Sequence, residues 1–341
     1  MRPSQSTRSP SRQKTTATGF GAQKSRSSKS TSCHDQTHWN GNADRRDPTL
    51  RWSIAATKRG LVCLALSFGS VISCVPAPVS TNGPADPVLW LNAEAGISVT
   101  APATAVTDSA RQPFWQDQSG AGNHAFVIDR PPGAADGPQL DRRPRLVREK
   151  GRASLQFDGQ DDLLGLADAQ GLNLGDPWAE RTIALTFSTS SDIDRRQMIF
   201  ETGGDLRGFN VYLDAGRLHM SAYDLWDDDG GRTTPFGPLD VGAPISSGMT
   251  YAVVFELNQP AGTVRGWVNR ELVGELNGAG RVFQHHEDAG IGAINEDTYY
   301  HDGVRQGVPA ADFFAGELEQ VLIYNRALTR SERSVLWQLL Q

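Results

Sequence analysis

The sequence predicts an all-β protein, a two-sheet antiparallel jelly-roll sandwich that ends in one short helix. Beyond residue 86, apolar residues recur at every second position rather than every third or fourth, which is typical of strands. Turns separate these runs, and the 341 residues include 35 Gly and 19 Pro. Only the last segment has helical spacing. Many short strands divided by such turns indicate a sandwich or jelly roll.

The predicted strands have one buried face and one wet face. Ile183, Leu185 and Phe187 alternate with Thr and Ser, as expected when one side of a strand packs on a core. Other runs of this kind occur along the chain. In chain order, the further strand candidates are Val88–Leu91, Ser154–Phe157, Gln197–Glu201, Gly290–Ile294 and Glu317–Tyr324.

Two hairpins follow from turn residues set between alternating runs. Residues 209–222 contain the turn sequence Asp-Ala-Gly at 214–216. Residues 251–268 contain a longer turn at 258–262. Asp, Asn and Gly tolerate the backbone angles that tight turns need, so both segments predict antiparallel pairs.

The C-terminal segment predicts the only helix. Thr329 followed by Glu332 forms a capping box, which satisfies backbone N–H groups at a helix start. The predicted apolar stripe consists of Val335, Leu336, Leu339 and Leu340. With no internal repeat and no linker beyond residue 86, residues 86–341 are predicted to form one sandwich domain.

Charge divides the chain into two unlike parts. Residues 1–60 hold 12 Lys and Arg against 3 Asp and Glu, whereas the rest holds 21 against 36. Residues 1–57 hold scarcely any aliphatic side chains to bury, so we expect a disordered basic extension. A basic arm for nucleic acid is the alternative for this extension, but the acidic larger part argues against a nucleic-acid surface, and we expect no nucleic-acid partner.

An apolar run follows the basic extension. Lys58 and Arg59 precede the uncharged run 60–73, which is shorter than the roughly 20 residues needed to span a bilayer. Residues 58–74 are therefore predicted to be an export signal. An export signal usually lies at the very start of a chain. The long extension would be explained if its start site were placed too far upstream and the real start lay near Leu50.

The end of the signal resembles a bacterial lipobox. Residues 71–74 read Val-Ile-Ser-Cys, and in a lipobox the cysteine after a small residue is cut and acylated. By that resemblance Cys74 is a lipidation site and membrane anchor, with residues 75–85 as a spacer. An ordinary secretory signal cut after Ala77, or a short signal anchor, are the alternatives. Either way the predicted location is the cell envelope or the outside of the cell.

Cysteine usage limits the chemistry of the domain. Cys33, Cys63 and Cys74 all precede the predicted sandwich, so residues 75–341 contain none. An internal disulfide and a thiolate metal site are therefore excluded there. A domain of about 260 residues buries enough surface to be stable without such links.

Five blocks of sequence, in order, resemble bacterial laminin-G-like domains of the concanavalin A-like lectin/glucanase superfamily. The blocks are Val88–Ala93, Trp115–Ala125, Leu155–Asp162, Phe314–Leu318 and Ile323–Thr329. They span about residues 86–341. The resemblance implies a curved, concanavalin A-like sandwich, often exported, that binds glycans or protein partners and sometimes calcium. Because this superfamily contains lectins, hydrolases, lyases and adhesion modules, function has to be argued from the site.

A hydrolase would need two carboxylates placed for catalysis. Laminarinase-type members carry Glu, x, Asp, x, x, Glu on one strand, and that run does not occur in this sequence. Glu317 and Glu319 lie two apart without the third acid. We therefore predict no catalytic residues.

Three clusters of metal-ligating residue types occur in predicted loops. His285, His286, Glu287 and Asp288 could hold zinc only if a loop turned both histidines together, because adjacent residues on a strand face opposite ways. Calcium prefers carboxylate and carbonyl oxygens, so it is the metal that acidic loops would hold. The predicted calcium ligands are Asp224, Asp227, Asp228 and Asp229, and the second candidate set is Asp158, Asp161 and Asp162. Turn capping is the alternative role of the second set.

Glycan binding needs an aromatic ring beside amides and carboxylates that bond sugar hydroxyls. Two loops offer both. The predicted ligand-binding residues are Trp226, Asn295, Tyr299, Tyr300 and His301. The alternative is that these aromatic rings fold back onto the edge of the sandwich.

These observations predict an exported, envelope-associated module that binds carbohydrate or a cell-surface protein without chemistry of its own. One alternative is a polysaccharide-degrading hydrolase or lyase of the same superfamily. A purely structural or protein-interaction module of the envelope is the other.

Overall fold

The computed structural model describes residues 83–97, 114–128, 142–149, 151–175, 177–204, 206–227, 234–307 and 310–341. The basic extension 1–57, the export signal 58–74 and Cys74 lie outside the described residues, so those predictions stay predictions. No helix within the described ranges is long and apolar enough to cross a membrane.

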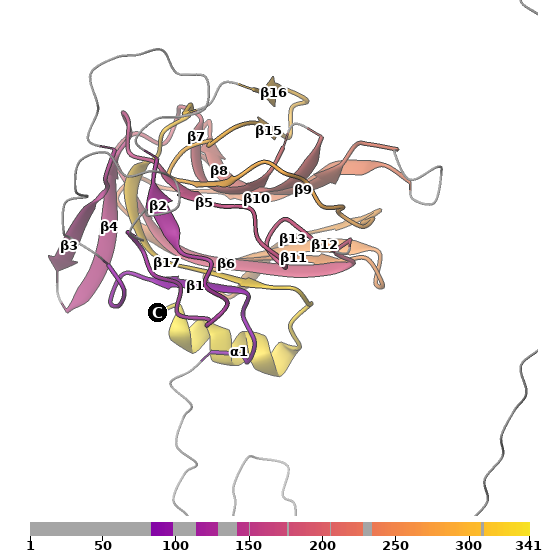
Figure 1. Ribbon diagram of the computed structural model, residues 1–341, viewed down its shortest axis with the longest axis horizontal. Helices are drawn as coiled ribbons and strands as arrows, with labels where there is room; N and C mark the ends of the chain where they lie inside the picture. Colours follow the sequence, from indigo (N-terminus) through magenta and orange to yellow (C-terminus); the bar gives the residue numbers. More distant parts are fainter. Residues whose placement is uncertain are drawn as a thin grey trace, which may run out of the picture. The chain divides into compact units, whose positions relative to one another are not determined.

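Two antiparallel sheets make up the sandwich (Figure 1). The larger sheet runs in the order β13 (Glu271–Asn277), β12 (Thr263–Val268), β11 (Thr250–Asn258), β6 (Glu180–Thr189), β17 (Ala315–Tyr324), β4 (Arg152–Asp158) and β3 (Arg145–Glu149), with β1 (Leu89–Asn92) also on β17. The smaller sheet runs β10 (Phe236–Pro244), β9 (Arg217–Asp224), β8 (Arg207–Asp214), β7 (Gln197–Gly203), β14 (Ala289–Ile291), β5 (Leu164–Leu166) and β2 (Ala125–Val127). The predicted fold class is confirmed.

The core lies between the two sheets because alternate residues of each strand point the same way. Leu185 and Phe187 of β6 and Val211 and Leu213 of β8 are fully buried in one apolar cluster. That cluster draws side chains from both sheets, as a face-to-face sandwich requires.

Both predicted hairpins form. Strands β8 and β9 pair from Arg207–Asp224 to Asp214–Arg217, and β11 pairs with β12 in the second hairpin. The predicted strand Gly290–Ile294 is shorter than expected and ends at Ile291, since Gly292 has φ of 82° and leaves the strand conformation. A larger residue at position 292 would also clash, because a Cβ there would lie 2.2 Å from the ring of Phe157.

Strand β17 occupies the middle of the larger sheet. Its first half pairs with β4 and its second half with β1, so these two strands lie end to end along one side of it. Its other side pairs with β6 along almost the whole strand. The first and last described strands of the sandwich are therefore neighbours.

Helix α1 (Arg330–Leu339) covers part of the outer face of the larger sheet (Figure 1). The predicted capping box is present, because Thr329 accepts the Glu332 N–H and Glu332 accepts the Thr329 N–H at 2.8 Å. Leu336 is fully buried against the sheet. Its neighbours in that outer cluster include Trp337, Leu340, Leu322 and Tyr324.

A two-stranded ribbon covers the outer face of the smaller sheet. It consists of β15 (Thr298–Tyr299) and β16 (Arg305–Gln306), which Figure 1 shows above β7, β8 and β9. We call residues 295–307, which include this ribbon, the covering segment.

Candidate functional site

The outer face of the smaller sheet carries hydrogen-bonding side chains where an apolar layer would be usual for buried positions. On β9, Leu218, Met220 and Ala222 join the core, so the alternate residues face outward. These outward residues are His219, Ser221 and Tyr223, and all three are buried. Burial of polar groups costs free energy unless they are hydrogen-bonded, so their partners define the site.

The covering segment supplies many of those partners through its backbone. Tyr223 Oη accepts the Tyr299 N–H at 3.1 Å and donates to the carbonyl of Gly204 at 2.8 Å. The Asn210 side-chain amide donates to the Tyr299 carbonyl at 2.9 Å. Outward-facing side chains of β8 and β9 thus hold Tyr299 from two sides.

A stack of three rings lies toward the β8–β9 turn. The His219 ring is 4.2 Å from His301 and 4.9 Å from Tyr212, in nearly parallel orientation in each case. Tyr212 Oη lies 2.6 Å from His301 Nδ1. Asp240 of β10 contacts His219 Nδ1 at 2.8 Å and accepts the Ser221 hydroxyl at 2.7 Å. Since Ser221 and His219 both bond to Asp240 and not to each other, the arrangement is not that of a serine nucleophile and its base.

Arg196 holds the covering segment to the sheet at the end where the β8–β9 turn lies. It bonds Asp214 at 2.6 Å and Asp302 at 2.8 Å, and its guanidinium lies 4.2 Å from the centre of the Tyr300 ring. Burial alone would lower the pKa of Arg196, but the hydrogen bonds to Asp302 and Asp214 outweigh burial and raise it. Arg196 therefore stays charged.

Acidic side chains gather at the opposite end of this face, where β7 ends. Glu201 is fully buried and accepts N–H groups from Gly203 at 3.0 Å and Asn295 at 3.3 Å. Burial raises the pKa of Glu201 well above its ordinary value, although these two bonds oppose the shift. The buried carboxyl of Glu201 therefore binds a proton more readily than an exposed glutamate does.

Two half-buried acids stand beside Glu201. Burial, with the nearby charges of Asp288 and Glu287, raises the pKa of Glu296 to about 7. Burial, with the charge of Glu287, raises the pKa of Asp297 to about 6. This end of the face therefore gains or loses protons close to neutral pH.

The adjacent histidines of the predicted zinc cluster contact different carboxylates. His285 is buried with Nδ1 3.2 Å from Glu287, whereas the exposed His286 lies 3.4 Å from Asp168. The hydrogen bond from His285 is the main cause of a lowered pKa at Glu287, against the opposing effect of burial. The geometry gives no shared ligand point for the two imidazoles.

Trp226 follows β9 at the same end. Half of its side chain is exposed, and Arg207 lies 5.6 Å from its ring. Asp224 is buried and accepts the N–H groups of Trp226 at 3.3 Å and Phe283 at 2.8 Å. Asp224 thus fastens the neighbouring loops.

The other predicted calcium ligands in that loop are exposed or undescribed. Asp227 is exposed, and Asp228 and Asp229 lie outside the described residues. The calcium site predicted for Asp224, Asp227, Asp228 and Asp229 therefore stays a prediction. Asp224 itself helps to hold the fold, because it accepts the N–H groups of Trp226 and Phe283.

The second acidic set lies in the turn after β4. One oxygen from each of Asp158, Asp161 and Asp162 lies within 4.8 Å of the others. Asp158 accepts the Gln160 N–H at 2.7 Å, and Asp162 accepts the Asp158 N–H at 2.8 Å. These are the bonds of turn capping, which was the alternative role.

The predicted glycan-binding residues divide into two groups. Tyr299 is half-buried and its ring centre is 5.9 Å from that of Tyr223, while His301 and Trp226 are exposed. Asn295 and Tyr300 are buried, with Tyr300 bonded to Asp312 at 2.5 Å. The covering segment folds these two side chains inward, and their predicted contact with ligand stays a prediction.

Several residues of this face were not predicted from the sequence. They are Tyr212, His219, Tyr223, Asp240, Glu201 and Arg196. For Tyr212, His219 and Tyr223, the alternation of β8 and β9 assigned these outward positions to solvent. The signal that could have found them is the presence of two Tyr and one His at positions expected to be wet, where Thr or Lys is more usual.

Three buried oxygens of this face have no hydrogen-bond partner among the described residues. They belong to the side chains of Asn210, Asn295 and Asp297. Buried acceptors are normally satisfied by protein or water, so the polar network has acceptor capacity left over.

No protein-family model matches the chain, and no curated protein matches it significantly. Solved structures with a similar fold include the botulinum neurotoxin serotype G binding domain, at 10% identity and a TM-score of 0.48, covering 74% of this chain and 51% of that one. Another is the binding domain of botulinum neurotoxin DC in complex with rat synaptotagmin II, at 10% identity and 0.46, covering 75% and 52%. The chain spans about half the length of these domains.

A third similar structure is a smaller domain. It is the Ruminococcus gnavus IT-sialidase CBM40 bound to α2,3-sialyllactose, at 16% identity and a TM-score of 0.38, covering 52% of this chain and 92% of that one. Such distant likeness indicates no ligand, and the fold assignment rests on the two sheets themselves.

Proposed function

We propose that this protein is an exported, envelope-associated module that binds carbohydrate or a surface ligand at the outer face of the smaller sheet, without chemistry of its own. One observation supports the proposal most directly. At one end of this face, the half-buried Tyr299 lies on the covering segment with Glu296 and Asp297, and the half-exposed Trp226 follows β9, the strand whose Tyr223 bonds the Tyr299 N–H. Aromatic rings beside carboxylates are the groups that cover a sugar face and bond its hydroxyls.

The scaffold beneath these side chains favours binding. Tyr223 and Asn210 fix the backbone of Tyr299 from rigid strands, so little conformational entropy is lost when a ligand contacts that residue. Asn295 and Tyr300, which were predicted as contacts, anchor the covering segment from within.

The test is a glycan array followed by calorimetric titration of the best hit, with Trp226→Ala and Tyr299→Ala. Each variant is expected to weaken binding at least about fivefold, since loss of an aromatic contact costs about 1 kcal/mol. Leu272→Ala is the matched control, because Leu272 is also half exposed but lies on β13 of the larger sheet. Unchanged affinity in both aromatic variants would contradict the proposal.

Export and anchoring belong to the same proposal. The laminin-G-like resemblance and the lipobox-like Cys74 support a lipid-anchored protein on the cell envelope. Cys74→Ser is expected to abolish incorporation of labelled fatty acid and to release the protein from the membrane fraction. Retention of label in that variant would assign the anchor to another residue.

Calcium is the proposed metal of the loop that carries Asp224, Asp227, Asp228 and Asp229. If it binds there, added calcium raises the melting temperature and a chelator reverses the rise. Asp227→Asn is expected to remove the effect. An equal shift in that variant would place the ion elsewhere, for example at Asp158, Asp161 and Asp162.

Polysaccharide cleavage is the second candidate function, and one observation favours it. Glu296 and Asp297, with pKa values of about 7 and 6, are near the range in which a carboxyl group can act as an acid or a base at neutral pH. Incubation of the protein with the glycans that it binds distinguishes the two functions. New reducing or unsaturated ends, lost in Glu296→Gln, would establish an enzyme. A protein that binds no glycan would be the structural module.

A further inference from the structure

The larger sheet leaves half of its outer face uncovered by helix α1. The covered half is apolar and includes Ala184, Val254 and Leu322. Beyond the helix the same face becomes polar, starting with Thr186, whose hydroxyl donates to the carbonyl of Leu340 at 3.0 Å. The change occurs along single strands, because Ala184 and Thr186 are two apart on β6.

The strand register places five polar side chains in one row across five strands. Arg145 pairs with Gln156, Gln156 with Glu317, Glu317 with Ser188, and Ser188 with Thr250. Neighbouring strands are about 4.8 Å apart, so the row is about 19 Å long. We call these five residues the polar row.

Side-chain bonds hold the polar row in place. Arg145 donates to Gln156 Oε1 at 2.7 Å, and the Ser188 and Thr250 hydroxyls are 2.7 Å apart. Glu317 accepts the hydroxyl of Ser154 at 2.7 Å. These contacts orient an amide, a carboxylate and two hydroxyls along one direction.

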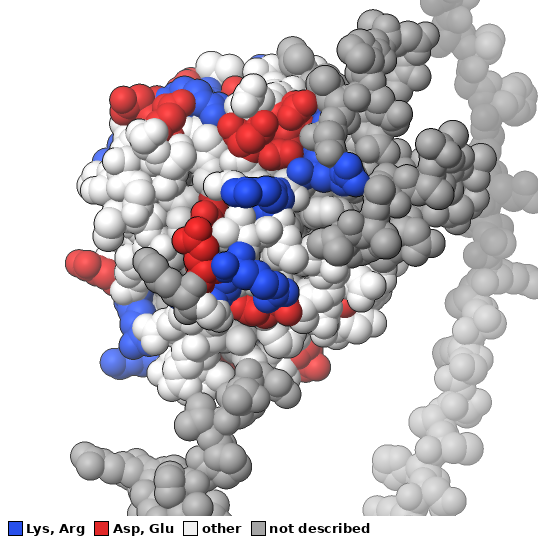
Figure 2. All heavy atoms as spheres, turned by 90° about the vertical axis from the view of Figure 1, so that its left-hand side faces the viewer, with Lys and Arg blue, Asp and Glu red and all other residues white. Residues whose placement is uncertain are grey.

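Two hollows lie along the polar row. One of about 600 Å³ is lined by residues that include Arg145, Gln156, Ser188 and Glu317. Figure 2 looks onto the side of the sandwich that carries β3 and β4, where basic and acidic side chains lie close together.

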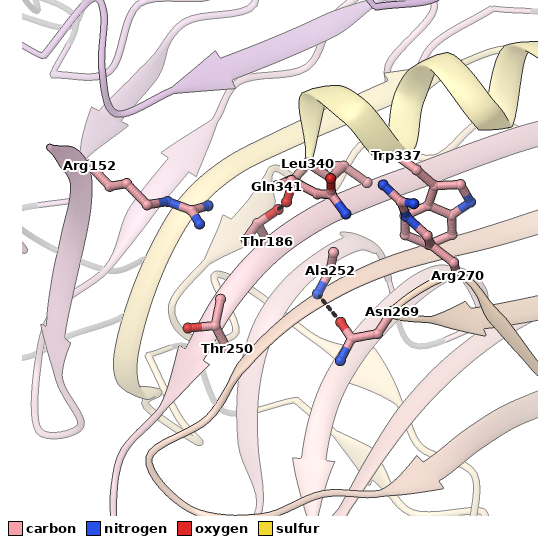
Figure 3. Close-up of a pocket in the computed structure, with 9 residues that line it drawn as sticks. All are labelled: Arg152, Thr186, Thr250, Ala252, Asn269, Arg270, Trp337, Leu340 and Gln341. Atoms are coloured by element: carbon pink, nitrogen blue, oxygen red, sulfur yellow. Dashed lines mark hydrogen bonds between the residues drawn. The ribbon is translucent and has the colours of Figure 1, made fainter. Parts of the chain in front are cut away.

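The second hollow, of about 400 Å³, continues past Thr250 toward the end of α1. Figure 3 shows Asn269, Arg270 and the ring of Trp337 on one side of it and Arg152 on the other. Thr250 and Thr186 lie between these groups in the same view. No residue lines both hollows, but Ser188 of the first and Thr250 of the second are hydrogen-bonded to each other. We call the two hollows together with the polar row the groove.

Charged side chains of both signs line this groove, since the first hollow also includes Arg143, Asp158 and Asp162. Its arginines differ in their partners. Arg152 pairs with Glu319, which leaves it neutralised. Arg145, by contrast, bonds only to the uncharged Gln156 among the described residues, and Arg270 bonds to none of them. Both side chains are exposed. A ligand with acidic groups near its two ends would complement them.

The chemistry of the groove excludes one kind of ligand. A peptide strand recognises a sheet through free backbone groups at its edge, but this is a sheet face, where strand N–H and C=O groups already pair. Recognition must come from side chains, and the row offers hydroxyl, amide and carboxylate groups with a tryptophan ring at one end. These groups suit the hydroxyls and ring faces of sugars.

We propose that this groove binds a linear, acidic carbohydrate chain that runs across the strands from Arg145 to Arg270. This site is separate from the one under Proposed function and lies on the other sheet. Arg145 and Arg270 contact the acidic groups, and Gln156, Glu317, Ser188 and Thr250 bond the hydroxyls between them.

The test titrates the intact protein with oligogalacturonate and with a neutral xylo-oligosaccharide of equal length. Oligogalacturonate is expected to bind more tightly, with an affinity that falls as salt rises. The double variant Arg145→Gln and Arg270→Gln is expected to lower that affinity at least tenfold, by order of magnitude for two charge-assisted contacts. Because both side chains are exposed, circular dichroism should show an unchanged fold.

Two further variants make the result specific. Arg148→Gln is the matched control, since Arg148 lies on the same strand, faces the other way and bonds the exposed Glu94. It should leave binding unchanged, as should Tyr299→Ala. Equal binding of the neutral chain, no binding of oligogalacturonate, or full affinity in the double variant would overturn the proposal. Loss of binding in Tyr299→Ala would move the ligand to the smaller sheet.

Discussion

The two sheets cover their outer faces by different means. Helix α1 covers the larger sheet through apolar contacts, with Leu336 and Trp337 buried against it. The covering segment lies on the smaller sheet through hydrogen bonds, ion pairs and stacked rings, such as those of Tyr223 and Arg196. Apolar burial stabilises in proportion to area, whereas a polar contact adds little net stability but fixes geometry. The helix therefore contributes mainly stability, and the covering segment mainly fixes the position of side chains.

Among the variants that test this difference between the two covers, Leu336→Ala should cause the largest loss of stability. Truncation of a fully buried Leu on the helix removes apolar contact and leaves a cavity, so the free energy of unfolding should fall by about 2–5 kcal/mol. Chemical denaturation measures it. The control is Leu276→Ala on β13, which is exposed and should change stability by less than about 0.5 kcal/mol. Equal losses in both variants would show that the helix contributes little.

Tyr223→Phe should cause the next largest loss of stability. It removes a buried hydroxyl that bonds both the Gly204 carbonyl and the Tyr299 N–H, and unpaired buried groups cost about 1–3 kcal/mol. Amide exchange of Tyr299 should also become faster. Tyr251→Phe is the control, since its hydroxyl bonds the Ser246 N–H where water can replace it. Unaltered exchange at Tyr299 would mean that the covering segment is held by other contacts.

The alternation of apolar and polar residues predicted most of the fold. The β8–β9 hairpin was predictable because alternation on both sides leads into Ala215 and Gly216, whose positive φ angles the Asp-Ala-Gly turn accommodates. Strand β13 was not, because it lies at the sheet edge and Glu271, Leu272 and Glu275 are exposed on both of its faces, so no buried face left a periodic signal.

The candidate site was predictable only where side chains reach the surface of loops. Trp226 and Tyr299 stood out as aromatic residues among acids and amides. Tyr212 and His219 did not, because both are buried beside His301, which lies 89 and 82 residues further along the chain. Alternation identifies the face of a strand but not what later covers that face.

The protonation of Glu296, on the covering segment, makes the stability of the protein depend on pH. Its pKa rises from 4.5 to about 7 on folding, so between these pH values the folded state holds a proton that the unfolded state has lost. Stability should therefore fall as pH rises through this window, by an amount on the order of 1 kcal/mol after allowance for solvent screening. Glu296→Gln should flatten that part of the wild-type curve. Identical curves for the two proteins between pH 4.5 and 7 would contradict the shift.

Thr329→Ala should have the smallest effect. It removes the capping box at the start of α1, and an exposed cap of this kind contributes about 0.5–1 kcal/mol. Ser334→Ala in the exposed middle of the helix should not destabilise, because Ala favours helix more than Ser does. Thermal melts of the two variants compare them directly. A larger loss for Ser334→Ala would show that the cap is dispensable.

The central place of β17 sets the order in which the protein can be assembled during synthesis. Without residues 315–324 the larger sheet separates into the four strands β13, β12, β11 and β6, the pair β4–β3, and an unattached β1. Each piece would expose unpaired strand edges, which promote aggregation. The larger sheet therefore closes only after residues 315–324 have been synthesised, and such long-range pairing makes folding slow.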